Sequence, residues 1–325
     1  MSISKKVKIP AILIVGIGIG VILSNLFIFS DTVENVNNQT PVEDSILTPY
    51  NVFQPHIPDE LDFCGEEVPL QNFDVKEALD LELVINTYRH SSTILYIKRA
   101  NRYFPEIEKI LAENGVPDDF KYLCVAESGL YNAISPSNAV GFWQFMKATA
   151  KERGLEVNGN VDERYNPVLS AIAATEYLKQ AYYYFGDWTL AAASYNMGMG
   201  GLKRDMDFQR VDNYWDLKLN DETARYVYRI LAYKVILSNP KDYGFNIPQE
   251  DRYPVLETVE IKVDSTINDL VQFAFDNGTN YKMLKYFNPW LRGQSLINNS
   301  NKEYTILIPA NGVRNCEIPE DTEQE

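Results

Sequence analysis

The sequence predicts a mainly α-helical protein with a small βααβ unit near its C-terminus and one N-terminal transmembrane helix. Three observations predict this class. Apolar residues recur at helical spacing from Asn72 onward, no alternating strand pattern occurs before residue 254, and an uncharged apolar run covers residues 9–29. With 325 residues and a hydrophobic fraction of 45%, the chain can form one substantial domain and a smaller one.

The N-terminal apolar run has Lys5, Lys6 and Lys8 on one side and Asp31 on the other. About 20 apolar residues suffice to cross a bilayer core, and a basic flank favours the cytoplasmic side. We therefore expect residues 1–30 to be a signal anchor that leaves the rest of the chain outside the cytoplasm. A cleaved signal peptide is the alternative, and the length of the run and the missing A-x-A pattern disfavour it.

Composition divides the rest of the chain into four segments. Residues 31–71 are rich in Asn, Pro, Asp and Glu and are expected to form an extended linker. Residues 72–250 carry the helical pattern, residues 254–312 the βααβ pattern, and residues 313–325 form an acidic tail. The elements expected with defined bounds are Pro167–Phe185, Trp188–Tyr195 and Thr223–Ser238 as helices, Glu257–Val263 as a strand, Thr266–Asp276 and Tyr281–Phe287 as helices, and Tyr304–Ile308 as a closing strand.

Charge and composition exclude several classes of function. The net charge is −15, whereas a nucleic-acid partner requires a basic surface. The two histidines, His56 and His90, lie far from cysteine or carboxylate clusters, which disfavours a zinc site or a Ser-His-Asp triad. There is no Gly-rich phosphate loop. We expect no metal and no cofactor, so any hydrolase or lyase chemistry must use carboxylates.

The three cysteines, Cys64, Cys124 and Cys316, form no CxxC pair. Cys124 lies in a helical apolar stripe, which is typical of a small buried residue. A Cys64–Cys316 bridge outside the cytoplasm stays open.

Glu127 is the carboxylate most suited to chemistry. The helix expected to begin at Pro117 has Phe120 and Cys124 on its apolar face, and Glu127 follows on that face just before Gly129 ends the helix. Because burial disfavours ionisation, its pKa should be raised, as a glycosidase acid requires. The alternative is a Glu that reaches water or caps the backbone, and periodicity alone does not decide between the two.

Four sequence blocks surround this residue along the chain. They are Glu127-Ser128-Gly129-Leu130, Gly141-Phe142-Trp143-Gln144, Ser194-Tyr195-Asn196-Met197-Gly198 and Glu222-Thr223-Ala224-Arg225-Tyr226-Val227. In this order and spacing they resemble the family 1 lytic transglycosylases, which have a soluble-transglycosylase, goose-lysozyme-like domain, and among them the membrane-bound D type. The resemblance covers roughly residues 105–237. It implies a lysozyme-like helical catalytic domain whose partner is the glycan strand of peptidoglycan.

The resemblance also implies roles for single residues. Glu127 would be the catalytic acid and base, and Tyr226 would close on it. The residues expected to bind substrate or line the cleft are Ser128, Gly141, Trp143, Gln144, Tyr195, Asn196 and Tyr226. For Trp143, packing in the core is an equally good interpretation of the sequence.

The blocks contain no clear second carboxylate. Asp187 is expected to cap the helix that starts at Trp188, and Glu222 lies in the first turn of its own helix. Hydrolysing glycosidases commonly use two carboxylates, whereas the resemblance implies one. Glu127 would protonate the oxygen between N-acetylmuramic acid (MurNAc) and N-acetylglucosamine (GlcNAc) and then help to close a 1,6-anhydro ring. A goose-type lysozyme-like hydrolase and an inert wall-binding scaffold remain as alternatives.

Residues 254–312 resemble a LysM domain, which binds GlcNAc-containing glycans. The residues that support this are Asp264-Ser265-Thr266-Ile267, Leu270, Leu284, Asn288-Pro289 and Ile306-Leu307-Ile308-Pro309. The alternative is a packing module that only braces the catalytic domain. The sequence thus predicts an enzyme of the cell envelope, anchored in the cytoplasmic membrane with its catalytic domain in the periplasm. Its protein partners stay open.

Overall fold

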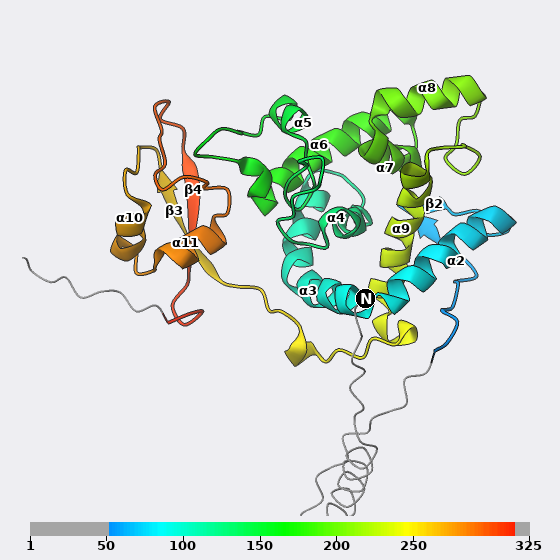
Figure 1. The fold of residues 1–325 in the computed structure, drawn as a ribbon, viewed down its shortest axis with the longest axis horizontal. Helices are drawn as coiled ribbons and strands as arrows, with labels where there is room; N and C mark the ends of the chain where they lie inside the picture. Colours follow the sequence, from blue (N-terminus) through cyan, green and yellow to red (C-terminus); the bar gives the residue numbers. More distant parts are fainter. Residues whose placement is uncertain (1–51, 316–325) are drawn as a thin grey trace, which may run out of the picture. The chain divides into compact units, whose positions relative to one another are not determined.

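A computed structural model describes residues 52–315 of the chain (Figure 1). The expected transmembrane run, much of the expected linker and Cys316 lie outside the described residues. Within residues 52–315, no helix is both long enough and apolar enough to span a membrane. The described chain is mainly helical with two small sheets, which confirms the expected class at that level.

The larger, helical unit is built around α9. Its α-helices are α2 (Phe73–Tyr88), α3 (His90–Glu113), α4 (Phe120–Ser128), α5 (Lys147–Glu152), α6 (Pro167–Phe185), α7 (Trp188–Met197), α8 (Met199–Gln209) and α9 (Asp221–Ser238), with short 3-10 turns η1 (Glu163–Tyr165), η2 (Pro240–Tyr243) and η3 (Gln249–Asp251). α9 packs against α2, α4 and α7 and lies between α4 and α2 in Figure 1. Ten of its side chains are buried, so it is the central helix of this core.

Helix α4 carries Glu127 and begins later than expected. The segment after Pro117 makes i→i−3 bonds, such as Phe120 N–H to the Pro117 carbonyl at 3.2 Å, so it is a tighter turn and the α-helix begins at Phe120. The helix ends as expected at Gly129, which has a φ of 63° and donates its N–H to Val125 at 2.8 Å. Cys124 is fully buried, as expected.

A short hairpin corrects the expected linker. β1 (Asp62–Phe63) pairs with β2 (Glu66–Glu67) in antiparallel fashion, although no strand was expected before residue 254. Phe63 is 0% exposed, and its ring meets Phe120 edge-on with centroids 5.4 Å apart. The Glu66 carboxylate accepts the N–H of Trp188 at 2.7 Å and so caps α7. The polar composition predicted an extended chain, but the buried Phe63 ring and the Glu66 cap fix this stretch to the core.

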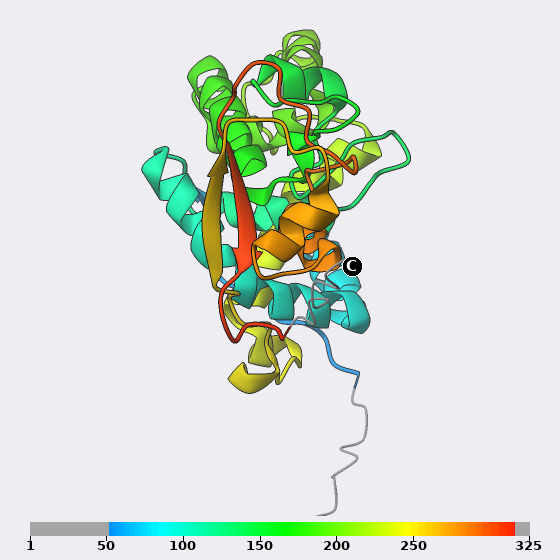
Figure 2. The same ribbon diagram turned by 90° about the vertical axis from the view of Figure 1, so that its left-hand side faces the viewer.

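The C-terminal unit, residues 258–309, has the expected βααβ order. β3 (Thr258–Val263) pairs antiparallel with β4 (Tyr304–Pro309), and α10 (Leu270–Asp276) and α11 (Tyr281–Phe287) connect them. Figure 2 shows the two strands side by side with the orange helical segment packed beside them. α10 begins at Leu270 rather than Thr266, because the Asp269 carboxylate accepts the N–H groups of the first turn.

Candidate active site

Glu127 lies half-buried in the last turn of α4, and a tyrosine from the distant helix α9 reaches it. The Tyr226 hydroxyl donates a short hydrogen bond to Oε1 of Glu127. Burial raises the pKa of Glu127 to about 7, while the Tyr226 hydrogen bond and the positive charge of Arg229 act in the opposite direction and Glu222 adds to the rise. A carboxyl group with this pKa can both give and take a proton near neutral pH.

Tyr226 is held in place by the way α9 begins. The Asn220 side chain caps the helix by accepting the N–H groups of Glu222 and Thr223, both at 3.1 Å. One turn further on, Tyr226 is 2% exposed. Burial and the neighbouring Glu127 raise the pKa of the Tyr226 phenol far above its usual value. Tyr226 therefore stays protonated near neutral pH and can donate to the Glu127 carboxylate.

A buried carboxylate on α2, not identified from the sequence, fixes the positive charges of this site. Glu82 is 1% exposed and accepts Nε of Arg225 at 2.6 Å, with Nε of Arg229 at 3.8 Å from its other oxygen. Arg229 also pairs with Glu222 at 3.0 Å. Glu82 thereby holds Arg229 where its charge lowers the pKa of Glu127. Helical spacing places Glu82 among the apolar residues of its helix, the same signal that marks Glu127.

The segment Gly141–Gln144 forms a tight turn that only glycine can begin. Gly141 has a φ of 89°, and a Cβ built there would lie 1.9 Å from the carbonyl oxygen of Arg164. Gln144 also has a positive φ, 49°. Its Nε2 donates to the carbonyls of Gly141 at 2.7 Å and Ala133 at 3.1 Å. These two bonds fix the orientation of the Gln144 amide group. Its Oε1 is then the atom that can accept a hydrogen bond from a ligand.

Trp143 does not line a cleft. Its side chain is 0% exposed, so the expectation of substrate contact was wrong and the packing interpretation holds. Its backbone has a different use, because the Tyr195 hydroxyl donates to the Trp143 carbonyl at 2.8 Å. Tyr195 was expected to hydrogen-bond the carboxyl or the substrate. Its hydroxyl instead joins α7 to the Gly141–Gln144 turn. Burial raises the pKa of Tyr195 well above its usual value, and the charge of Glu127 adds to the rise.

Asn196 and Ser128 are held by their neighbours. Oδ1 of Asn196 accepts the Thr223 hydroxyl at 2.7 Å, which leaves Nδ2 as the group able to donate to a ligand. The Ser128 side chain is buried and donates to the Cys124 carbonyl, one helical turn back, at 3.3 Å. It therefore supports the end of α4 and makes no hydrogen bond to Glu127.

An exposed aromatic ring beyond Gly129 adds a surface that the sequence blocks did not mark. Tyr131 is 50% exposed, and the Arg99 guanidinium lies 5.0 Å from the centre of its ring. Arg99 also donates to the Gly129 carbonyl at 2.9 Å, which ties this ring to the end of α4. An exposed phenol ring of this kind offers a stacking surface for a sugar.

The two other carboxylates considered from the sequence have structural partners. Asp187 accepts the N–H of Leu190 at 2.6 Å and caps α7, as expected. Glu222 is exposed and paired with Arg229. Neither has a hydrogen bond to Glu127 among the residues described. No group of three or more His, Cys, Asp or Glu side chains placed to hold a metal ion occurs between residues 52 and 315.

Two parts of the chain match models of known protein families. Residues 104–217 match the model of the transglycosylase SLT domain, and residues 259–312 match the soluble lytic transglycosylase C-terminal LysM-like domain. The chain therefore carries an SLT domain. The match includes Glu127, Gln144 and Asn196 but ends before Tyr226.

Two curated relatives carry the same description, "Membrane-bound lytic murein transglycosylase D". They come from Escherichia coli strain K12 and from E. coli O6:H1. Each is 30% identical over 256 residues, which cover 76% of this chain and 55% of the relative. The chain thus spans about half the length of the curated relatives that it matches.

Proposed function

We propose that this protein is a lytic transglycosylase that cleaves the MurNAc-β-1,4-GlcNAc bond of peptidoglycan and leaves 1,6-anhydro-MurNAc ends. Residues 72–250 would form its lysozyme-like catalytic domain. The observation that carries the proposal is the Glu127 carboxyl, with its pKa raised by burial to about 7 and Tyr226 bound to Oε1. The SLT domain match and the two relatives support the substrate class.

Glu127 would act first as an acid. Its proton goes to the glycosidic oxygen, the bond between that oxygen and C1 of MurNAc breaks, and GlcNAc leaves as an alcohol. The carboxylate that remains keeps the Tyr226 hydrogen bond and the nearby charge of Arg229, both of which favour its ionised form. The substrate's own 2-acetamido group would stabilise the positive centre at C1.

Glu127 would then act as a base. The carboxylate takes the proton of the C6 hydroxyl while O6 bonds to C1, which closes the anhydro ring and returns Glu127 to its protonated form. Atoms balance without water. Asn196 Nδ2 and Gln144 Oε1 are the groups left to bind the sugar amide, since their other amide atoms are occupied within the protein.

The C-terminal unit, within residues 254–312, is proposed to bind glycan as a LysM-like domain. We also propose that the N-terminal apolar run anchors the enzyme in the cytoplasmic membrane, with the catalytic domain in the periplasm. The relatives' description as membrane-bound supports this placement.

The test is digestion of purified sacculi, with mass spectrometry of the released muropeptides. Wild type should give anhydro ends, and Glu127→Gln should give none. Glu222→Gln is the matched control, because it removes an exposed carboxyl whose charge acts on Glu127, and it should give the same products as wild type. Reducing MurNAc ends would support the goose-type hydrolase instead. An active Glu127→Gln variant would rule out this mechanism, and an inactive wild type would support the scaffold.

A further inference from the structure

The hydrophobic core of the C-terminal unit contains residues of the helical unit. Val140, Val161 and Tyr165 are 4%, 0% and 8% exposed, and they cluster with Leu284 and Leu291 of the C-terminal unit. Val140 directly precedes Gly141, so the segment that bears Gln144 is anchored in the core of the other unit. Removing the C-terminal unit would expose these apolar side chains to water.

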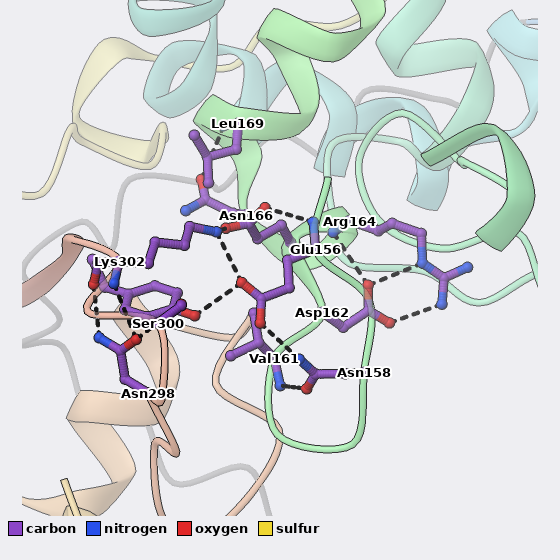
Figure 3. Close-up of polar contacts among 12 residues, drawn as sticks. Glu156, Asn158, Val161, Asp162, Arg164, Asn166, Leu169, Asn298, Ser300 and Lys302 are labelled. Carbon is purple, nitrogen blue, oxygen red and sulfur yellow. Dashed lines mark hydrogen bonds and ion pairs between the residues drawn. The ribbon is translucent and has the colours of Figure 1, made fainter. Parts of the chain in front are cut away.

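The two units are also joined through their backbones. Val161 pairs with Leu291 in an antiparallel bridge, and the Asp162 N–H donates to the Trp290 carbonyl at 2.9 Å. The Arg292 N–H donates to the Asn160 carbonyl at 2.7 Å. These bonds fix the loop before η1, which Figure 3 shows at its contact with the C-terminal unit.

A lysine of the C-terminal unit completes the contact. Nζ of Lys302 lies 2.9 Å from Glu156 and 2.6 Å from Glu163, and the Tyr304 hydroxyl donates to Glu156 at 2.9 Å. Glu163 is 4% exposed, and Lys302 is the cation that pairs with it in the described part of the chain. A buried carboxylate without its cation is strongly destabilising. Lys302 therefore holds the loop in this conformation.

The same loop holds the Gly141–Gln144 turn. Asp162 accepts Nε and Nη2 of Arg164 at 2.9 and 2.8 Å, which fixes the guanidinium (Figure 3). Nη1 of Arg164 donates to the Phe145 carbonyl at 3.2 Å, at the end of the turn. The carbonyl of Arg164 packs on Gly141, at its start. Lys302 and Trp290 hold the loop and η1, and Arg164 of η1 in turn contacts both ends of the Gly141–Gln144 turn.

We propose that the C-terminal unit is a positioning element for catalysis: its docking through Lys302 holds the Gly141–Gln144 turn in place against α4, the helix that carries Glu127. Lys302 is a positioning residue in this scheme and has no contact with substrate. The role is distinct from binding the wall, because it acts through the loop at Glu156–Arg164. The inference rests on the proposed function for the measurement of turnover only. The measurement of hydrogen exchange does not depend on that function.

The test uses the full chain with Lys302→Met, which keeps the aliphatic stem and removes the charge. We expect kcat on soluble glycan strands to fall about tenfold with KM little changed, because a small displacement of a positioned group costs this much. Hydrogen exchange at residues 138–145 should speed up, while exchange in α9 stays as in wild type. Lys302→Arg should restore both. Lys262→Met is the matched control, because Lys262 pairs with Glu303 at 2.7 Å within the C-terminal unit.

Three results separate this inference from its rivals. Unchanged exchange at residues 138–145 in Lys302→Met would overturn it, and this readout needs no enzymatic activity. A loss seen only in KM, together with weaker sacculus binding in a Glu127→Gln background, would assign Lys302 to wall binding and also overturn it. If wild type cleaves no glycan, the proposed function fails, and faster exchange in Lys302→Met would still support the positioning of the turn.

Discussion

Replacing Glu127 with Gln should stabilise the fold, and by more at pH 8 than at pH 5. Burial raises the pKa of Glu127 from 4.5 to about 7 in the folded protein. Between pH 4.5 and about pH 7, the Glu127 carboxyl keeps its proton in the folded protein but releases it in the unfolded chain. The stability of the wild-type protein therefore falls as the pH rises through this range. At about 1.4 kcal/mol per pH unit the full effect is about 3.5 kcal/mol, of which about 2.5 kcal/mol develops between pH 5 and pH 8.

Urea unfolding of both proteins at the two pH values measures this effect. Gln keeps an oxygen that can accept the Tyr226 hydroxyl but carries no titrating group, so its stability lacks this component of the pH dependence. The gap between Gln and wild type should widen by about 2.5 kcal/mol from pH 5 to pH 8. Glu113→Gln, at the exposed end of α3, is the control and should show no such widening. A gap that is constant, or that narrows with pH, would refute the reasoning.

Three further changes test other parts of the site. Tyr226→Phe removes a hydrogen bond that lowers the pKa of Glu127, so the basic limb of the pH–rate profile should move up by about one to two pH units. Gly141→Ala would place its Cβ against the Arg164 carbonyl and should abolish activity and destabilise the fold by about 1–3 kcal/mol in urea. Glu82→Ala should destabilise by about 1–3 kcal/mol in the same assay, because Arg225 and Arg229 lose the buried acceptor that joins α9 to α2.

The changes at Gly141 and Glu82 each have a control in the same fold. Gly200→Ala in α8 has open space around the new methyl group and should leave activity intact. Glu77→Ala lies on the exposed side of α2 and should change stability little. If Tyr226→Phe shifted the basic limb downward, the hydrogen bond would not be favouring the ionised carboxylate. Equal losses in Glu77→Ala and Glu82→Ala would contradict the importance of the buried pair.

Helix boundaries could be predicted where local chemistry sets them. The bounds of α6 were predicted without error, because Asn166 and Pro167 start it and Gly186 ends it, each by its own backbone preference. The end of α4 at Gly129 followed from the same rules. The β1–β2 hairpin could not be predicted, because nothing local distinguishes Phe63 from any other aromatic in a polar stretch. Its burial depends on the core that α4 and α7 provide.

The candidate site residues also differ in whether the sequence alone could predict their contacts. Motif order predicted the contact between Glu127 and Tyr226, which the structure shows across 99 positions of sequence. It could not say which way Trp143 faces, because inward and outward orientations of a turn residue give the same sequence. Nor did it identify Glu82, whose role exists only once α2 packs on α9. A pattern indicates that a side chain is buried, but tertiary packing decides what it is buried against.

The pKa of Glu127 depends on opposing contributions from separate helices. Burial on α4 would by itself favour the protonated form, and such a carboxyl would be slow to act as a base. Tyr226 and Arg229, both on α9, favour the ionised form, and Arg229 is held there by Glu82 from α2. A group that serves as acid and then as base needs a pKa between these extremes. In the proposed mechanism, the packing of α9 against α2 and α4 would therefore serve catalysis as well as the core.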